Sequence, residues 1–183
     1  MLIVTERERL PVAEARAGDL ASWDALFRRY QLPLYVYVIE LVRDEQASLD
    51  LVQETFISAV RHIGGLREDA KFGSWLFGIA HQKCLQQWRR NARKEALFDE
   101  RAEIPADYAE GPAEALVREE REAELMRLLH QLPLPQRSVL LLHFVEDFPL
   151  EEIAAITGAP IGTVKSRIHY AKRALRHLLE DQP

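Results

Sequence analysis

The stretch from Leu150 to Arg176, LEEIAAITGAPIGTVKSRIHYAKRALR, has the pattern of two helices joined by a tight turn. Ile153 and Ile156 point inward from the first helix, and Gly158 supplies the left-handed corner that ends it. Pro160 then opens the second helix, because a proline at the first helical position loses only an amide that has no intrahelical partner. The stretch therefore predicts a helix-turn-helix.

The predicted second helix has one apolar and one polar face. Its inward stripe recurs at helical spacing and consists of Ile161, Val164, Ile168, Ala171 and Leu175. The opposite face and its flanks hold the expected DNA contacts: Thr163, Lys165, Ser166, Arg167, His169, Tyr170, Lys172, Arg173 and Arg176. No acidic residue falls between Gly162 and Leu179, so the helix offers phosphate-neutralising charge beside a face that can reach base edges. The alternative is an ordinary surface helix with a solvated basic face, which the spacing, the turn proline and the acid-free sequence together disfavour.

Length and composition predict an all-α protein that lies in the cytoplasm. The chain has 183 residues, enough for one or two small domains, and its glycines and prolines sit mostly between long helical patterns. The single cysteine, Cys84, excludes an internal disulfide and a cysteine-pair zinc site, so a reducing compartment is expected. The first residues become charged too early for a signal peptide, and the longest apolar runs are too short for membrane insertion.

The net charge of −5 is unevenly distributed along the chain. Basic residues end one segment near Arg93 and fill the second helix of the helix-turn-helix, whereas acidic residues dominate between them. This pattern predicts two small helical domains, residues 1–95 and 121–183, joined by an acidic linker at residues 96–120. A disordered spacer without a defined path remains an alternative for the linker.

The N-terminal segments predict two successive helices. Asp19 can cap a helix that runs to about Tyr30, and a second helix is expected from Pro33. The segment Leu34–Val42 favours a strand on local propensity, because it is rich in β-branched and aromatic residues. We nevertheless predict a helix there, since no second strand lies nearby to pair with it.

The segment from Glu45 to His62 predicts an amphipathic helix. Its inward stripe is expected to be Leu49, Val52, Phe56, Ala59 and Ile63. Its outward face holds Asp50, Gln53, Glu54, Ile57 and Arg61, a mixed polar and apolar surface that suits a protein partner. Gly64 and Gly65 then break the helix before a loop through Arg67 to Lys71.

A long helix is predicted from about Phe72 to Lys94. One apolar stripe contains Phe72, Trp75, Leu76 and Ile79, and a second contains Phe77, Cys84 and Trp88, interrupted by His81. Such a helix is expected to be buried on one side and to meet something on the other. The spacing of His81 and Cys84 also occurs in metal sites, but no second ligand pair exists, so we expect no metal.

Two further motifs indicate which protein family the chain resembles. DLVQETF (Asp50–Phe56) and FGSWLFGIA (Phe72–Ala80) resemble the N-terminal conserved domain of extracytoplasmic-function sigma factors, the smallest members of the sigma-70 family. The helix-turn-helix, together with LPLPQRSVLLL (Leu132–Leu142), resembles the promoter-reading C-terminal domain of sigma-70-type factors. The resemblance covers nearly the whole chain from Asp19 to Leu179, although Gly78 replaces the arginine that is usual in the family.

The resemblance implies a transcription initiation factor without catalytic chemistry, cofactor or metal. It assigns Asp50, Gln53 and Glu54 to binding of core RNA polymerase, and the helix-turn-helix to the upstream promoter element. The loop and the helix that follows would capture a base of the downstream element, through Arg67, Asp69, Lys71, Phe72 and Gln82, although Phe72 and Trp75 also fit a core role. The rival interpretations are a self-sufficient helix-turn-helix regulator, for which no dimer surface is evident, and an enzyme with a DNA-binding tail, for which no catalytic cluster is evident.

The segment around Val36, Val38 and Ile39 is apolar on more than one side of its expected helix. A second covering surface is therefore required. It could be an anti-sigma factor, since family members are commonly inhibited by one, or it could be the C-terminal domain in a compact free state. The sequence leaves both possibilities open.

Overall fold

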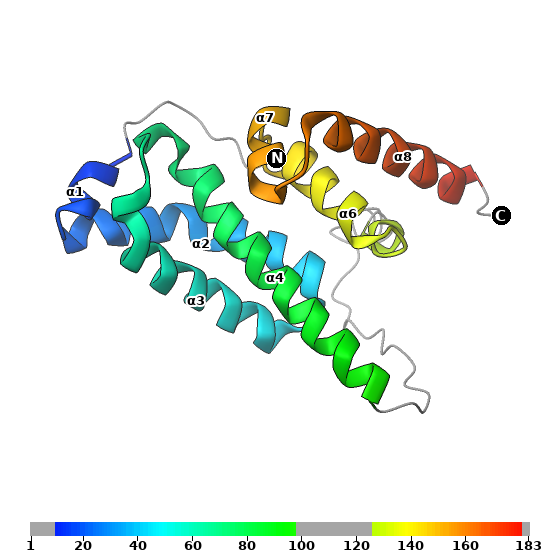
Figure 1. Ribbon diagram of the computed structural model, residues 1–183, viewed down its shortest axis with the longest axis horizontal. Helices are drawn as coiled ribbons and strands as arrows, with labels where there is room; N and C mark the ends of the chain where they lie inside the picture. The colour runs from blue at the N-terminus through cyan, green and yellow to red at the C-terminus, as the bar shows by residue number, and fades with distance from the viewer. Residues whose placement is uncertain (1–9, 98–125, 181–183) are drawn as a thin grey trace, which may run out of the picture.

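The computed structural model describes residues 10–97 and 126–180, and all regular structure in these two ranges is helical (Figure 1). The α-helices are α1 (Val12–Arg16), α2 (Leu20–Val42), α3 (Glu45–His62), α4 (Phe72–Leu97), α6 (Leu134–Leu140), α7 (Leu150–Thr157) and α8 (Ile161–Glu180). Residues 126–130 are also helical. The all-α prediction is therefore confirmed, and none of the described helices is long and apolar enough to cross a membrane.

Helix α2 is one continuous helix and not the two that were predicted. It begins at the N-cap Asp19, whose side chain accepts a hydrogen bond from the Ser22 amide at 2.8 Å, and it continues through Pro33. Pro33 removes one helical hydrogen bond, but buried residues on both sides of it, such as Leu26 and Leu34, hold the helix in place. The helical prediction for Leu34–Val42 is confirmed.

Helix α3 has the predicted bounds and a slightly rotated inward face. The Asp44 side chain caps it by accepting a hydrogen bond from the Ala47 amide at 2.7 Å. The buried residues are Ser48, Leu51, Val52, Thr55, Phe56 and Ala59. Leu49, which was predicted to point inward, is exposed, because the small Ser48 occupies the interior position beside it.

Helix α4 crosses α2 and α3 and carries the centre of the core. Phe72, Leu76, Phe77 and Ala80 are almost completely buried. The two predicted apolar stripes are thus both used over the first half of the helix. Trp88, farther along the second stripe, is exposed.

The helix-turn-helix consists of α7 and α8. Gly158 adopts φ 65°, the left-handed conformation expected at the end of the first helix. Helix α8 begins at Ile161, one residue later than predicted, so Pro160 precedes the helix instead of being its first residue. The Pro160 carbonyl accepts a hydrogen bond from the Val164 amide at 3.0 Å. A π-helical turn, Leu141–Val145, connects α6 to the segment before α7.

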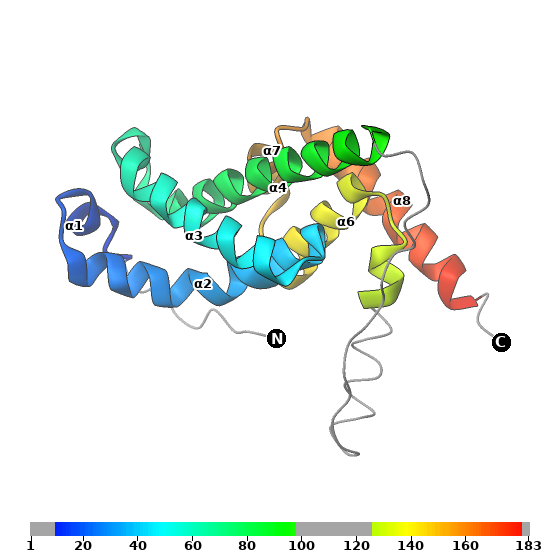
Figure 2. The ribbon, with the colours of Figure 1, turned by 90° about the horizontal axis from the view of Figure 1, so that it is seen from below.

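The two helical domains pack against each other and share one continuous hydrophobic core. Helix α7 lies against α4, and α6 lies against α2, as both views of the ribbon show (Figures 1 and 2). The C-terminal domain therefore covers part of the second apolar surface around Tyr37 and Val38, which are fully buried. Nearly all of the predicted acidic linker, from residue 98 onward, lies outside the described residues.

Candidate nucleic-acid and protein interfaces

Helix α8 presents its predicted DNA face to solvent. Val164, Ile168 and Ala171 are buried against the domain core, which fixes the orientation of the helix. The predicted contacts that are exposed are Lys165, Ser166, His169, Tyr170, Lys172, Arg173 and Arg176, whereas Thr163 and Arg167 are half-buried. The basic side chains on this face can neutralise phosphates, and the polar ones can reach base edges.

Phe144 lies beside this basic surface and was not predicted to take part in it. It belongs to the π-helical turn and is 56% exposed. The Lys172 ammonium lies 4.6 Å from the centre of the Phe144 ring, a cation–π contact that orients the lysine. Helical periodicity could not reveal this contact, because the two residues lie on different elements.

The outward face of α3 is open to solvent. Asp50, Gln53 and Glu54 are all exposed on it, as predicted. The Glu54 carboxylate pairs with the Lys83 ammonium of α4 at 3.3 Å, and the Gln46 amide donates to Asp50 at 3.2 Å. Ile57 on the same face is 44% exposed, so a partner docking here would gain apolar contact as well as hydrogen bonds.

The segment between α3 and α4 brings together some of the residues predicted for the downstream element. Arg67 and Lys71 are exposed, and Asp69 is half-buried. The Lys71 ammonium pairs with Glu68 at 3.0 Å. Lys71 thus lies at the start of α4 with its charge partly neutralised.

Phe72 is part of the hydrophobic core. Its side chain is fully buried, and its ring lies 5.5 Å from that of Tyr30, 5.8 Å from that of Trp75 and 6.4 Å from that of Trp23. A ring enclosed in this way cannot stack on a base in this structure. The placement therefore supports the core role for Phe72 over the predicted base contact.

Arg16 of α1 holds this segment in place, a role that the sequence did not reveal. Its guanidinium donates to the Leu66 carbonyl at 3.1 Å and forms an ion pair with Asp69. The Asp69 carboxylate is therefore already paired with a cation of the protein itself. Because Arg16 is 50 residues from Leu66 in sequence, no local pattern could indicate this contact.

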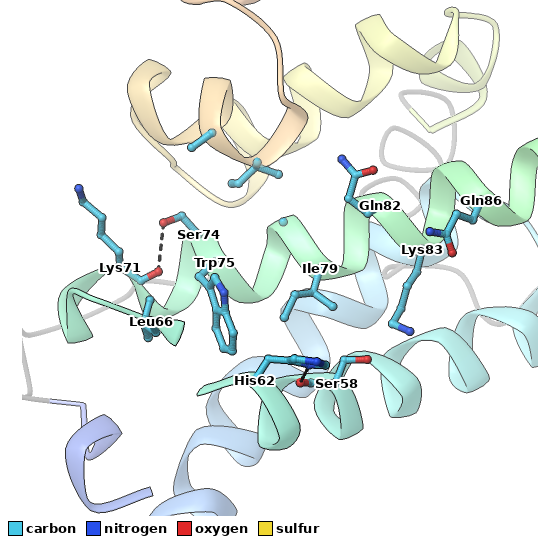
Figure 3. Close-up of a pocket in the computed structure, with 13 residues that line it drawn as sticks. Ser58, His62, Leu66, Lys71, Ser74, Trp75, Ile79, Gln82, Lys83 and Gln86 are labelled. Carbon is cyan, nitrogen blue, oxygen red and sulfur yellow. Dashed lines mark hydrogen bonds between the residues drawn. The ribbon is translucent and has the colours of Figure 1, made fainter. Parts of the chain in front are cut away.

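A groove of about 700 Å³ runs between α3, α4 and α7 (Figure 3). Trp75 and Ile79 extend from α4 toward Ser58 and His62 on α3. Lys71 and Gln82, both predicted for the downstream element, line the groove, whereas Arg67 and Asp69 do not. Ala155 and Ile156 of α7 form its opposite wall.

A buried polar pair lies on the other side of α4. The Tyr37 hydroxyl and His81 Nδ1 are hydrogen-bonded at 2.8 Å, and both residues are almost fully buried. Burial lowers the pKa of His81 to about 4, with a smaller contribution from the charge of Arg167. The imidazole is therefore neutral at physiological pH.

Cys84 is a buried thiol and not part of a ligand cluster. Burial raises the pKa of this thiol to about 12, which leaves it protonated and unreactive. Within residues 10–97 and 126–180, no group of three or more His, Cys, Asp or Glu side chains could hold a metal ion. The spacing of His81 and Cys84 instead reflects packing of one helix face.

Two family models match the chain, one over each domain. Sigma-70 region 2 matches residues 26–94, which include α3 and most of α2 and α4. Sigma-70 region 4 matches residues 122–175, which include α6, α7 and most of α8. The exposed α3 face lies within the region 2 match, and the α8 face lies within the region 4 match except for Arg176, which follows its last residue.

Curated relatives align over nearly the full length of the chain. The RNA polymerase sigma-H factor of Pseudomonas aeruginosa is 32% identical over 187 positions, covering 98% of this chain and 97% of that protein. The ECF RNA polymerase sigma factor SigL of Mycobacterium tuberculosis is 33% identical, covering 93% of this chain and 96% of the relative.

Solved structures share the fold. The sigma factor RpoE in complex with the anti-sigma factor NepR, from Bartonella quintana, has a TM-score of 0.70 and 25% identity, and the match covers 90% of this chain and 100% of that one. CnrH in complex with the cytosolic domain of CnrY has a TM-score of 0.72 and 22% identity, with 97% and 100% covered.

Proposed function

Because this chain belongs to the sigma-70 family, in its extracytoplasmic-function branch, we propose that α3 forms its main contact with core RNA polymerase and that α8 reads the upstream promoter element. The chain is an RNA polymerase sigma factor and not an enzyme: it binds core polymerase and directs promoter recognition and transcription initiation. The single observation that carries the proposal is the exposure of both predicted faces in a folded, two-domain chain.

The polymerase contact is assigned to Asp50, Gln53 and Glu54. Their exposure on one face of a helix whose other face is buried supports this assignment, since a rigid helix presents them without an ordering cost. Ile57 adds an apolar centre to the surface. The combination of an apolar centre and a polar rim is the usual anatomy of a protein interface.

The upstream element is assigned to α8. Ser166, Arg167, His169 and Arg173 are the residues proposed to lie nearest the bases, with Lys165, Lys172 and Arg176 on phosphates; Thr163 and Tyr170 complete the face. Base contacts would set the sequence preference, whereas phosphate contacts would set the register of the helix and the salt dependence of binding.

The downstream element is assigned to the region around Arg67, Lys71 and Gln82. The groove along α4 supports this assignment, because it holds Lys71 and Gln82 beside the half-buried indole of Trp75. A cation, an amide and an aromatic surface are suitable tools for holding a single strand. Asp69 would act indirectly, through its ion pair with Arg16.

The same proposal assigns a role to each domain and a cellular compartment to the chain. The polymerase-binding domain would comprise residues 1–95 and the upstream-element domain residues 121–183, with residues 96–120 as the linker. Because its partners are polymerase and promoter DNA, the chain would act in the cytoplasm.

We also infer an anti-sigma factor as an inhibitory partner, supported by the similarity to RpoE bound to NepR. Copurification from the native host tests this inference: recovery of polymerase alone, in every growth condition, would contradict it.

Pull-down of purified core polymerase tests the α3 assignment. Gln53→Ala with Glu54→Lys should abolish capture while leaving helical content and melting temperature nearly unchanged, because both side chains are exposed. The matched control is Gln31→Ala with Glu14→Lys, equally exposed positions on α2 and α1, which should bind normally. Undiminished capture by the folded Gln53/Glu54 variant would overturn the assignment.

A further inference from the structure

The π-helical turn Leu141–Val145 carries an exposed aromatic side chain beside α8. Leu141 and Leu142 of this turn are buried in the core. Phe144 and Val145, which follow them, are 56% and 45% exposed. Helical turns of the π type are rare and often occur at functional sites. Most of the Phe144 ring lies outside the core, so core packing does not account for an aromatic residue at this position.

The Phe144 ring is held in position by its own turn. The His143 ring lies edge-on to it, with the two ring centroids 4.6 Å apart. His143 Nδ1 in turn donates a hydrogen bond to the Phe148 carbonyl at 3.4 Å, and the Phe148 amide donates one to the Leu142 carbonyl at 2.9 Å. A ring that is fixed before DNA arrives can orient a neighbouring side chain at little further ordering cost.

The neighbour that Phe144 orients is Lys172 of α8. The Lys172 ammonium lies 4.6 Å from the centre of the ring, which is within the range of a cation–π contact. Lys172 is exposed, and no carboxylate pairs with it among the residues that the structure describes. The ring therefore restricts a flexible side chain whose charge stays available to a phosphate.

Lys172 belongs to a row of exposed side chains along α8. The row consists of Lys165, His169, Lys172 and Arg176, which follow one another at steps of four, three and four residues and thus share one edge of the helix. It contains all three side chains assigned above to phosphates. A row of cations along one edge of a helix in the major groove suits the phosphates of one DNA strand. Phe144 adjoins this row at Lys172.

We propose that Phe144 is a positioning residue for promoter binding: its ring holds the Lys172 ammonium where it contacts a phosphate of the upstream element. The inference rests on the proposed function, since it concerns a phosphate contact of α8. Phe144 acts through Lys172 and does not itself read a base. It therefore sets the strength of promoter binding and not the sequence preference.

Promoter affinity of the complex with core polymerase tests the proposal. The promoter is one recovered from a random library by the wild-type complex, and fluorescence anisotropy gives its dissociation constant at several salt concentrations. Phe144→Leu keeps an apolar side chain but removes the ring, so it should weaken binding by about two- to fivefold, the equivalent of an exposed cation–π contact. Phe144→Tyr keeps the ring and should bind as the wild-type chain does. All three chains should prefer the same sequence.

A lysine variant shows whether Phe144 acts through Lys172. Lys172→Met removes the charge and keeps most of the aliphatic stem, so it should weaken binding and reduce the salt slope by about one. Phe144→Leu should cause no further loss in the Lys172→Met chain, because the group that the ring positions is gone. The matched control is Val145→Ala, which shortens the neighbouring exposed side chain of the same turn and should leave affinity unchanged.

Two outcomes overturn the role of Phe144. One is equal promoter affinity of the Phe144→Leu and Phe144→Tyr chains. The other is a loss from Phe144→Leu that persists in full in the Lys172→Met chain, because the ring would then act by a route other than the lysine. A different result contradicts the proposed function itself: Lys172→Met and Arg176→Ala leave affinity unchanged, and Arg173→Ala leaves the sequence preference unchanged. In that case α8 does not read the upstream element.

Discussion

The outward face of α3 and the α7-facing side of α4 differ in what covers them. On α3, Gln53 and Glu54 face solvent and meet no other domain. On α4, Gly78 and Phe77 meet Ile156 and Phe148 of the C-terminal domain. One surface is thus ready for a partner, and the other is already occupied by the chain itself. The difference implies that polymerase capture and promoter engagement have different structural requirements.

Removing one apolar side chain from each surface should show the largest difference between them. Phe77 is almost fully buried, with its ring 5.4 Å from that of Tyr37 and 5.1 Å from that of Phe148. Phe77→Ala should lower the free energy of unfolding by ~3–5 kcal/mol, since it removes a buried ring and leaves a cavity. Ile57→Ala on the open face of α3 should change it by no more than ~0.5 kcal/mol. Urea denaturation measures both, and similar losses would show that the α3 face is also covered.

A smaller effect on stability should come from pH, through the buried titratable groups His81 and Glu146. Burial lowers the pKa of His81 from 6.5 to about 4, so the unfolded chain binds the proton more tightly. Stability from His81 is therefore present above pH 6.5 and lost as the pH falls toward 4, by about 3 kcal/mol in all. Burial raises the pKa of Glu146 from 4.5 to about 7, so its contribution falls as the pH rises over that interval. The two trends oppose each other.

Single substitutions should reveal the two opposing trends. Glu146→Gln leaves the His81 effect, so the free energy of unfolding should rise between pH 4.5 and pH 6.5. His81→Gln leaves the Glu146 effect, so the free energy of unfolding should fall over the same interval. The wild-type chain should change least of the three. Denaturation at several pH values provides the measurement, and identical pH profiles for the two variants would contradict the assigned causes.

Much of the fold could be predicted from local patterns. The helical bounds of α3, the left-handed Gly158 and the polar face of α8 follow from spacing and turn chemistry, which act over a few residues. The break at Pro33 was predicted by the same local reasoning and was wrong, because packing along α2 outweighs the lost hydrogen bond. Leu49 was assigned inward because it fits the three-and-four spacing of the apolar stripe, yet Ser48 is the buried residue.

The remaining features depend on contacts between distant segments. The hold of Arg16 on the loop at Leu66, the cation–π contact of Lys172 with Phe144 and the docking of α7 on Gly78 each join separate elements. No periodicity encodes such contacts. The apolar excess around Val38 did indicate that a second covering surface exists, and the described chain supplies one in the form of α6. The sequence could not decide between this surface and an external inhibitor.

Pulsed electron–electron resonance tests most directly whether the covered surface opens when the chain reaches a promoter. Spin labels at Gln31→Cys on α2 and His177→Cys on α8 occupy exposed positions in different domains, and the buried Cys84 thiol remains unlabelled. The free chain should give one narrow distance distribution, and the complex with core polymerase and promoter DNA should give a clearly longer distance. The same distance in both states would contradict the account.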